Sequence, residues 1–324
     1  MRSLTHTERF QGRRRRRRYF EGWYFKCISA DRRHAVAVIP GIASDPKGNR
    51  HAFIQIINAV SGKTYYFRFP YDQFESPEDR FSVRIGENAF DSSGLSLSLY
   101  SEEGSVCGQL KFANIRAFPV SRLRPGIMGP LTFVPFLECY HAIVHLSHSI
   151  CGQITLDGES LDFTGGSGYI EKDYGRSFPR KYIWIQAGHF ANGNAAFVFS
   201  RARIPFRIGS FTGFFGYFTD FRHMTLLFAS YNGSRLHSFQ VDPEAKTCSG
   251  VLTNRHGALE FRAEMSGGGR LRAPVDGLMS REIIESITAL VAVVVRNAKG
   301  QILYEGQSGE AGMEIAHTSV RIPV

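Results

Sequence analysis

The chain is poor in the residues that cross-link small secreted folds or hold structural metals. Its 324 residues include five cysteines, an odd number, and no two cysteines are separated by only two residues. A disulfide framework or a structural zinc site needs paired, closely spaced cysteines. The sequence therefore predicts reduced thiols and a cytoplasmic protein.

Long apolar runs are also absent. The first eighteen residues contain Leu4 and Phe10 as their only large apolar side chains, so no secretory signal is expected. A long stretch free of Lys, Arg, Asp and Glu, residues 139–156, holds three histidines and alternates in polarity. A membrane-spanning helix needs about 20 apolar residues in succession, so none is predicted.

Tryptophan is scarce, whereas the other aromatic residues are abundant. The chain has 2 Trp against 27 Phe and 13 Tyr, a balance that favours strands and apolar cavities. Apolar and polar residues alternate at 81–85 and 95–99, and turn sequences such as Asp157-Gly158 separate the alternating runs. Short alternating segments between turns predict an all-β protein made of antiparallel barrels or sandwiches.

The length exceeds that of a usual single hydrophobic core, which predicts two lobes. The glycine-rich residues 165–168 are the best candidate for the boundary between them. We therefore predict a basic flexible tail at 1–18, an N-terminal lobe at 19–164 and a C-terminal lobe at 165–324. Residues 283–295 are rich in β-branched side chains, which predicts one long strand.

Positive charge is concentrated in one run near the start of the chain. The formal net charge is +10 at pH 7, and Arg13–Arg18 supply six of these charges. Such a run is typical of a solvated tail, and it also suits an anionic membrane surface. Binding of nucleic acid would need aromatic residues interleaved with the basic ones, whereas Tyr19 and Phe20 follow the run. We expect peripheral membrane contact and no nucleic acid.

Two segments place carboxylates among aromatic rings. Residues 19–26 read YFEGWYFK, and residues 169–175 read YIEKDYG. The two tryptophans, Trp23 and Trp184, lie in the first segment and shortly after the second. An ionised carboxylate is costly among rings unless it is paired or protonated. These segments therefore predict a functional site.

Strand geometry sorts the charged residues of the second segment. Successive strand residues face opposite sides, so Glu171 and Asp173 share one face and Lys172 takes the other, unless a bulge intervenes. We expect Glu171 and Asp173 to line the cavity. The alternative is a structural ion pair of Glu171 with Lys172 or Arg176.

Histidines raise an alternative with a metal ion. On a strand, Cys139, His141 and His145 would share one face. Zinc takes about four ligands, and histidines on a barrel strand are more often hydrogen-bonded groups. We predict no metal and no cofactor.

The sequence resembles the tocopherol cyclase family, in particular its bacterial members. The resemblance is carried by residues 18–26 (RYFEGWYFK), 138–141 (ECYH), 168–175 (GYIEKDYG) and 311–315 (AGMEI), and it extends from about Phe10 to Ile315. It implies two lipocalin-like β-barrel lobes. It also implies an intramolecular lyase or isomerase that closes a chromanol ring on a prenylated phenol or hydroquinone.

A more distant similarity is to carotenoid hydratases of the hydroxyneurosporene synthase type. It implies an isoprenoid hydratase as an alternative activity. A lipocalin-like carrier, which binds an isoprenoid or prenylquinol lipid without catalysis, is a further alternative, because a fold does not determine a function. Asp173-Tyr174 replaces the Asn-Trp pair of the plant cyclases, so the resemblance leaves the substrate open.

Cyclisation and hydration begin with the same step. A carboxylic acid protonates a trisubstituted alkene, and a phenol oxygen or water captures the tertiary cation. Burial beside rings keeps such an acid protonated, and π-faces stabilise the cation. We predict Asp173 or Glu171 as the acid, Glu21 as an orienting group and Lys172 as a ligand of the phenol oxygen. The predicted substrate-binding residues are Trp23, Tyr24, Tyr174, Trp184, Glu138 and His141.

Overall fold

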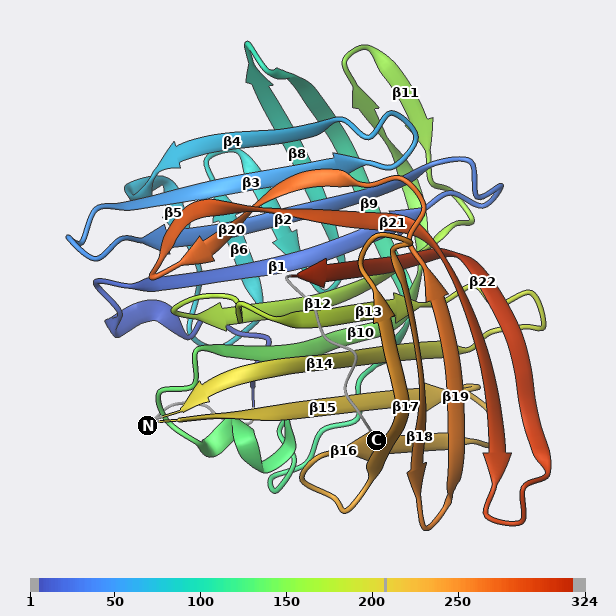
Figure 1. The fold of residues 1–324 in the computed structure, drawn as a ribbon. Helices are drawn as coiled ribbons and strands as arrows, with labels where there is room; N and C mark the ends of the chain where they lie inside the picture. The colour runs from blue at the N-terminus through green and yellow to red at the C-terminus, as the bar shows by residue number, and fades with distance from the viewer. Residues whose placement is uncertain (1–5, 207–208, 317–324) are drawn as a thin grey trace. The chain divides into compact units, whose positions relative to one another are not determined.

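The computed structural model describes residues 6–206 and 209–316, and antiparallel strands dominate them (Figure 1). Helical structure among these residues is limited to three 3-10 turns, η1 (Gly12–Arg14), η2 (Tyr71–Gln73) and η3 (Gly129–Phe133). None of the helical segments in the described ranges has the length and apolar character needed to cross a membrane. The predicted all-β class is confirmed.

The chain divides into two compact units. Unit 1 holds the described residues up to Phe178 together with Leu271–Glu282. Unit 2 holds Pro179–Arg270 and the described residues from Ile283 onward. Each unit is built on its own antiparallel sheet, as expected for two lipocalin-like lobes.

The sheet of unit 1 has the strand order β4-β3-β2-β1-β12-β10-β9-β8-β7-β6-β5, and β11 pairs with β10. Its strands are β1 (Tyr19–Ile28), β2 (Ala35–Ser44), β3 (Arg50–Asn58), β4 (Thr64–Pro70), β5 (Phe74–Glu75), β6 (Ser82–Ile85), β7 (Asn88–Asp91), β8 (Gly94–Ser101), β9 (Gly104–Ala117), β10 (Cys139–Leu156), β11 (Glu159–Asp162) and β12 (Ser167–Gly175).

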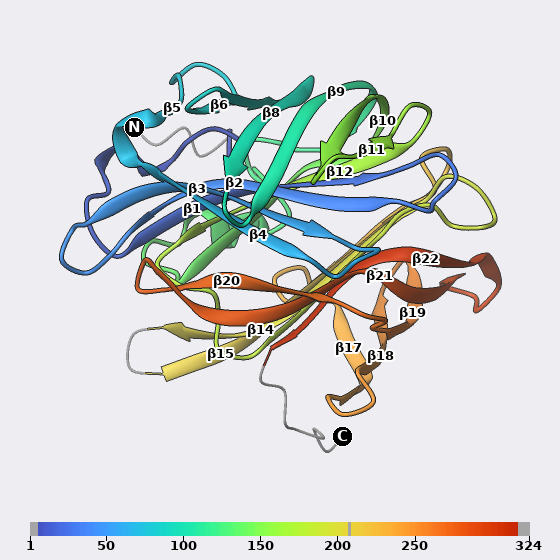
Figure 2. The same cartoon turned by 90° about the horizontal axis from the view of Figure 1, so that it is seen from above.

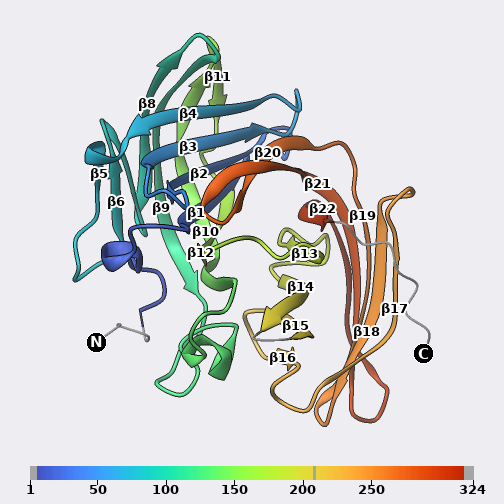
Figure 3. The same cartoon turned by 60° about the vertical axis from the view of Figure 1, so that its left-hand side comes forward.

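This sheet curls so that its central strand meets strands far along the order. Figure 2 and Figure 3 show β8 and β9 running across the direction of β1–β4. The ring of Phe25 in β1 lies 5.7 Å from that of Phe90 in β7 and 6.2 Å from that of Phe112 in β9. A curled sheet buries its own inner face in this way, as small barrels do.

The second sheet belongs to unit 2 except for residues 271–282 of β20 and β21, which fall in unit 1. It has the order β16-β15-β14-β13-β22-β21-β19-β18-β17, and β20 pairs with β21. Its core includes Phe197 and Phe199 of β14, whose rings lie 5.6 Å and 4.5 Å from the ring of Phe261 in β19. The strands are β13 (Tyr182–Ala187), β14 (Ala196–Phe206), β15 (Gly209–Thr219), β16 (Thr225–Ala229), β17 (Arg235–Asp242), β18 (Thr247–Asn254), β19 (Gly257–Glu264), β20 (Gly269–Val275), β21 (Leu278–Asn297) and β22 (Ile302–Ala316). The long strand predicted at 283–295 is confirmed by β21.

Within the glycine-rich residues 165–168, Gly165 and Gly166 form a tight turn inside unit 1, and Ser167 and Gly168 begin β12. Gly165 has a φ of +78°, and a Cβ on Gly166 would lie 2.1 Å from the carbonyl oxygen of Ile28. The strand that follows, β12, pairs with both β1 and β10 at the centre of the sheet. This pairing keeps β12 in unit 1, so the division of the chain falls after Phe178 and not at the glycines.

The segment before β1 contacts unit 1 through its backbone. The Ser44 hydroxyl donates a hydrogen bond to the carbonyl oxygen of Arg16 at 2.5 Å. The Arg18 N–H donates to the carbonyl oxygen of Asp45 at 3.1 Å. The sequence predicted a flexible tail at 1–18, of which 1–5 lie outside the described residues. The arginine run is anchored to the sheet, with the side chains of Arg16, Arg17 and Arg18 exposed.

We predict that Gly166→Ala destabilises unit 1 by about 1–3 kcal/mol, because the added methyl group overlaps the Ile28 carbonyl. The measurement is urea unfolding followed by Trp23 fluorescence in a Trp184→Phe background. Gly126→Ala is the control, since its Cβ would meet only Thr7 Oγ1 at 3.7 Å. Equal midpoints for the two variants would contradict the packing described for this turn.

Candidate active site

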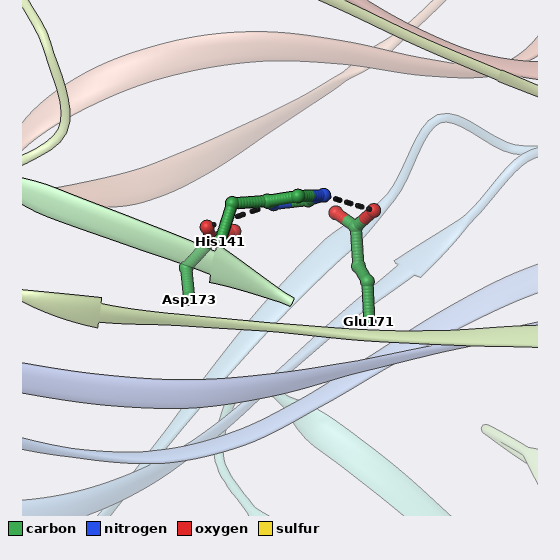
Figure 4. Close-up of side chains that lie close together, drawn as sticks. All are labelled: His141, Glu171 and Asp173. Carbon is green, nitrogen blue, oxygen red and sulfur yellow. Dashed lines mark hydrogen bonds and ion pairs between the residues drawn. The ribbon is translucent and has the colours of Figure 1, made fainter. Parts of the chain in front are cut away.

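Strands β10 and β12 bring a histidine between two carboxylates. His141 of β10 lies opposite Asp173 of β12. The His141 Nδ1 atom is 3.0 Å from Asp173 Oδ1, and its Nε2 atom is 3.5 Å from Glu171 Oε2. Figure 4 shows the imidazole reaching from one carboxylate to the other. Glu171 and Asp173 share one face of β12 because they are two residues apart.

Two further side chains contact the carboxylates of this group. The Tyr169 hydroxyl donates a hydrogen bond to Glu171 Oε2 at 2.7 Å. Burial, and next the charge of Glu171, raise the pKa of Tyr169 well above its ordinary value, so Tyr169 remains a donor. The Cys139 Sγ atom lies 3.7 Å from Asp173 Oδ1. Burial and then Asp173 raise the pKa of this thiol.

The two carboxylates differ in their exposure. The side chain of Glu171 is 6% exposed and that of Asp173 is 22% exposed. The more buried carboxylate therefore lies beside Nε2 of the imidazole, and the more exposed one lies beside Nδ1.

Lys172 faces the other side of β12. Its Nζ atom lies 2.6 Å from Glu21 Oε1, and both side chains are fully buried. The ammonium also donates to the carbonyl oxygen of Thr7 at 2.8 Å and to that of Arg9. Its three donors are therefore satisfied by one carboxylate and two backbone carbonyls. Burial lowers the pKa of Lys172, and the charge of Glu21 opposes this shift.

Aromatic rings and the N-terminal segment enclose this ion pair. The Lys172 ammonium lies 4.9 Å from the ring centroids of both Trp23 and Tyr174. The Trp23 indole N–H donates to the carbonyl oxygen of Glu8 at 2.8 Å. The Gln11 N–H donates to Glu21 Oε1 at 2.8 Å. Four residues predicted to form the site are thus a buried cluster on the face opposite His141.

The other predicted residues take separate places. Tyr24 is buried and lies opposite Glu171 across the β1–β12 pairing, which places the two on one face. Glu138 precedes β10, and its Oε1 atom lies 3.9 Å from the Arg176 guanidinium. Trp184 belongs to β13 of unit 2, where its ring lies over Gly312.

A bulge in β10 changes the histidine pattern expected from the sequence. The pairing with β12 shifts between Ile143 and His145, so that His145 lies opposite Ile170, on the face of Lys172. There His145 Nδ1 lies 3.2 Å from His148 Nδ1. Cys139, His141 and His145 therefore do not share a face.

The three side chains that could hold a cation are not the set expected from the sequence, although His141 belongs to both sets. One ligand atom each from His141, Glu171 and Asp173 lie within 4.8 Å of one another. The sequence analysis did not predict that these three side chains form one group. The available signals were two carboxylates two residues apart on one strand, and a histidine in residues 138–141, a segment that also carries the family resemblance.

The all-β units, with a histidine between two carboxylates on a central strand pair of unit 1, define a lipocalin-like protein with a candidate site at these three side chains. Residues 115–317, more than half of the chain, match the tocopherol cyclase-like family, and the chain belongs to that family. The matched residues include β10 and β12, and with them His141, Glu171 and Asp173.

Two plant proteins match shorter segments. The tocopherol cyclase of Zea mays chloroplasts is 40% identical over 62 residues, which are 19% of this chain and 13% of that protein. A probable chloroplastic tocopherol cyclase of Oryza sativa subsp. japonica is 32% identical over 75 residues, 23% of this chain and 16% of that protein. The matches thus cover less than a fifth of the length of these relatives.

A solved structure shares the fold over most of the chain. The crystal structure of CghA with Sch210972 superposes with a TM-score of 0.55 and 10% sequence identity. The match covers 92% of this chain and 88% of that chain. At this identity the likeness establishes the fold alone.

We predict that Lys172→Met destabilises unit 1 by about 3–5 kcal/mol, because it leaves the Glu21 carboxylate buried without its cation. The double variant Glu21→Gln with Lys172→Met removes both charges of this pair and should recover most of the loss in urea midpoint. Arg33→Met is the control, since Arg33 pairs with Asp31 at the surface. A loss from Lys172→Met no larger than that from Arg33→Met would contradict the buried pair.

Acid should destabilise unit 1 through His145 and His148. Burial lowers the pKa of His145 to about 4, and burial and then His145 lower that of His148 well below its ordinary value. The unfolded chain therefore binds protons before the folded one as pH falls, so stability is full above about pH 6.5 and declines toward pH 4. The urea midpoint of the double variant His145→Asn/His148→Asn should depend less on pH than that of wild type. The control His256→Asn, which replaces an exposed histidine, should show the same pH dependence as wild type.

Proposed function

We propose that this protein is an acid-catalysed cyclase that closes a chromanol ring on a prenylated phenol or hydroquinone. The observation that carries the proposal is the imidazole of His141 between Glu171 and Asp173, two carboxylates on one strand face. Membership of the tocopherol cyclase-like family supports the reaction class. The substrate would be an isoprenoid or prenylquinol lipid.

The roles follow from burial and hydrogen bonding. Glu171 is the more buried carboxylate and is assigned as the proton donor. His141 shares the proton with Glu171 through Nε2 and restores it after turnover. Asp173 holds the imidazole through Nδ1, as an orienting carboxylate does in other acid–base sites.

The reaction balances without any further reactant. The proton of Glu171 forms a C–H bond with the less substituted alkene carbon as the π bond breaks, which leaves a tertiary cation. The phenol oxygen then forms a C–O bond with the tertiary cationic carbon and loses its proton, which returns to the carboxylate. Neighbouring rings on the same face, including Tyr24 and Tyr169, offer π-electron density to the cation.

Two other functions use the same face. In a hydratase, water instead of a phenol oxygen captures the cation. In a carrier, the carboxylates would serve only as structural ion pairs with basic residues such as Arg176. Arg176 pairs with Asp276 at 3.1 Å and with Glu138 at 3.9 Å, whereas Glu171 and Asp173 both meet His141. This pairing favours a catalytic group. A cytoplasmic location stays a prediction.

We predict that Glu171→Gln lowers turnover of a prenylated hydroquinone by about 100-fold or more, as expected for loss of a general acid. His141→Asn should cause a comparable loss, and Asp173→Asn a smaller one, because Asp173 acts through His141. The measurement is chromanol formation by liquid chromatography, with a chelator added in parallel to detect a metal requirement.

Glu282→Gln is the matched control, since it removes a carboxylate of unit 1 outside this group. Retention of the lipid by an inactive wild type, with no product from any prenylated phenol tested, would support the carrier. Full activity of Glu171→Gln would refute the assignment of the acid. An alcohol product in place of a chromanol would identify the hydratase.

A further inference from the structure

A pocket of unit 1 lies where the arginine run meets the ends of β10 and β12. It has a volume of about 270 Å³. Its lining residues include four arginines, Arg15, Arg17, Arg18 and Arg176, together with the aromatic residues Phe136 and Tyr140. The reaction proposed above uses none of these six residues.

The charges of this pocket are not balanced. Asp276 pairs with Arg18 at 3.4 Å and with Arg176 at 3.1 Å, and Glu138 lies 3.9 Å from Arg176. Within residues 6–206 and 209–316, no carboxylate forms an ion pair with Arg15 or Arg17. Four guanidinium groups therefore meet two carboxylates, which leaves a positive excess that an anion would neutralise.

The backbone holds the arginines in place. The Arg15 N–H donates to the carbonyl oxygen of Gly12 at 2.8 Å. The side chain of Arg17 runs past Gly48, where a Cβ would lie 3.5 Å from its Cγ and Nε atoms. Arg18 has a φ of 50°, in the left-handed region that non-glycine residues rarely adopt. An anchored set of guanidinium groups loses less entropy on binding than a free tail does.

The aromatic wall is fixed as well. The rings of Tyr140 and Tyr174 stack with centroids 5.0 Å apart and planes at 11°. The Tyr140 hydroxyl donates to the carbonyl oxygen of Val134 at 2.6 Å and accepts the Leu137 N–H at 3.3 Å. Phe136 is 82% exposed and has a φ of 65°. An exposed apolar ring held on a costly backbone conformation suits contact with an apolar ligand.

We propose that this pocket binds the phosphate or diphosphate group of an amphiphile whose apolar part lies on Phe136 and Tyr140. Guanidinium groups bind phosphate oxygens through paired N–H donors, and Arg15 and Arg17 are the two without a carboxylate. The head group can belong to a soluble prenyl phosphate or to a phospholipid in a bilayer. The proposal does not depend on the cyclase reaction, because its readout is binding.

The first test is calorimetric titration of the full chain with geranyl diphosphate and with inorganic diphosphate at low salt. Geranyl diphosphate should bind at least 10-fold more tightly than inorganic diphosphate. Arg15→Gln/Arg17→Gln should weaken its binding by at least 10-fold. Arg14→Gln/Arg16→Gln removes the same charge from the same run but not from the pocket lining, and should change affinity less than 2-fold.

A second matched pair of variants tests the contribution of the apolar side of the pocket. Phe136→Asn keeps a residue that tolerates a positive φ and should abolish the preference for geranyl diphosphate over inorganic diphosphate. Phe133→Asn removes another exposed ring of the same loop that does not line the pocket, and should leave the preference unchanged.

Sedimentation with phosphatidylglycerol vesicles distinguishes the two sources of the head group. Vesicle binding that is lost in Arg15→Gln/Arg17→Gln but kept in Arg14→Gln/Arg16→Gln identifies a bilayer phospholipid. Vesicle binding that is equal in both variants, together with selective loss of geranyl diphosphate, identifies a soluble ligand. Both results support the binding of a phosphate or diphosphate group in this pocket.

Three outcomes would overturn the proposal. The first is the absence of binding to every probe. The second is equal weakening by the two arginine pairs, which indicates non-specific charge. The third is equal affinity for inorganic and geranyl diphosphate, which indicates an adventitious ion only. Glu171→Gln should bind geranyl diphosphate like wild type, so failure of the cyclase proposal remains distinguishable.

Discussion

The pleat of β12 separates three charged residues that are adjacent in sequence. Glu171 and Asp173 point to one face and Lys172 to the other. If the ammonium shared the face of the carboxylates, it would neutralise them and hold them ionised. With Lys172 turned away, both carboxylates lie beside the imidazole of His141 instead of an ammonium. The separation of the two groups of charges depends on this alternation.

Lys172 in turn requires a partner, because an unpaired ammonium is very costly in a protein interior. Glu21 supplies the opposite charge, and the carbonyl groups of Thr7 and Arg9 take the remaining donors. Such a pair contributes little net stability compared with apolar packing. The pair nevertheless fixes the position of the segment before β1. If the carbonyl groups of Thr7 and Arg9 lay elsewhere, the Lys172 ammonium would lose two of its acceptors. The N-terminal segment is thereby part of the architecture of unit 1.

Periodicity was enough to predict the strands and the common face of Glu171 and Asp173, because alternation along a strand is a local property. The two lobes were predicted from the length of the chain. The position of His141 was only partly accessible. The resemblance placed it near the site, but its contact with both carboxylates depends on the register of β10 with β12, which adjacent residues do not encode. The bulge that turns His145 to the other face has no signature in the sequence.

The contacts of Thr7, Glu8 and Arg9 were inaccessible for another reason. They use backbone carbonyl groups, which every residue carries, so no side-chain pattern reveals them. The same applies to the division after Phe178. Glycines suggested a hinge, whereas the hydrogen-bonded pairing of β12 with two central strands decided where unit 1 ends.

The order in which the chain is synthesised affects when unit 1 can be completed. Unit 1 is discontinuous: Leu271–Glu282 joins it only after Pro179–Arg270 of unit 2 have been made. Gln55 exchanges two hydrogen bonds with the backbone of Arg272, at 3.0 Å and 2.8 Å. During synthesis, the Gln55 side chain therefore lacks this partner until residues more than two hundred positions downstream have been made. Contacts between distant parts of a chain slow folding, so we expect unit 1 to complete its packing only after β20 has emerged from the ribosome.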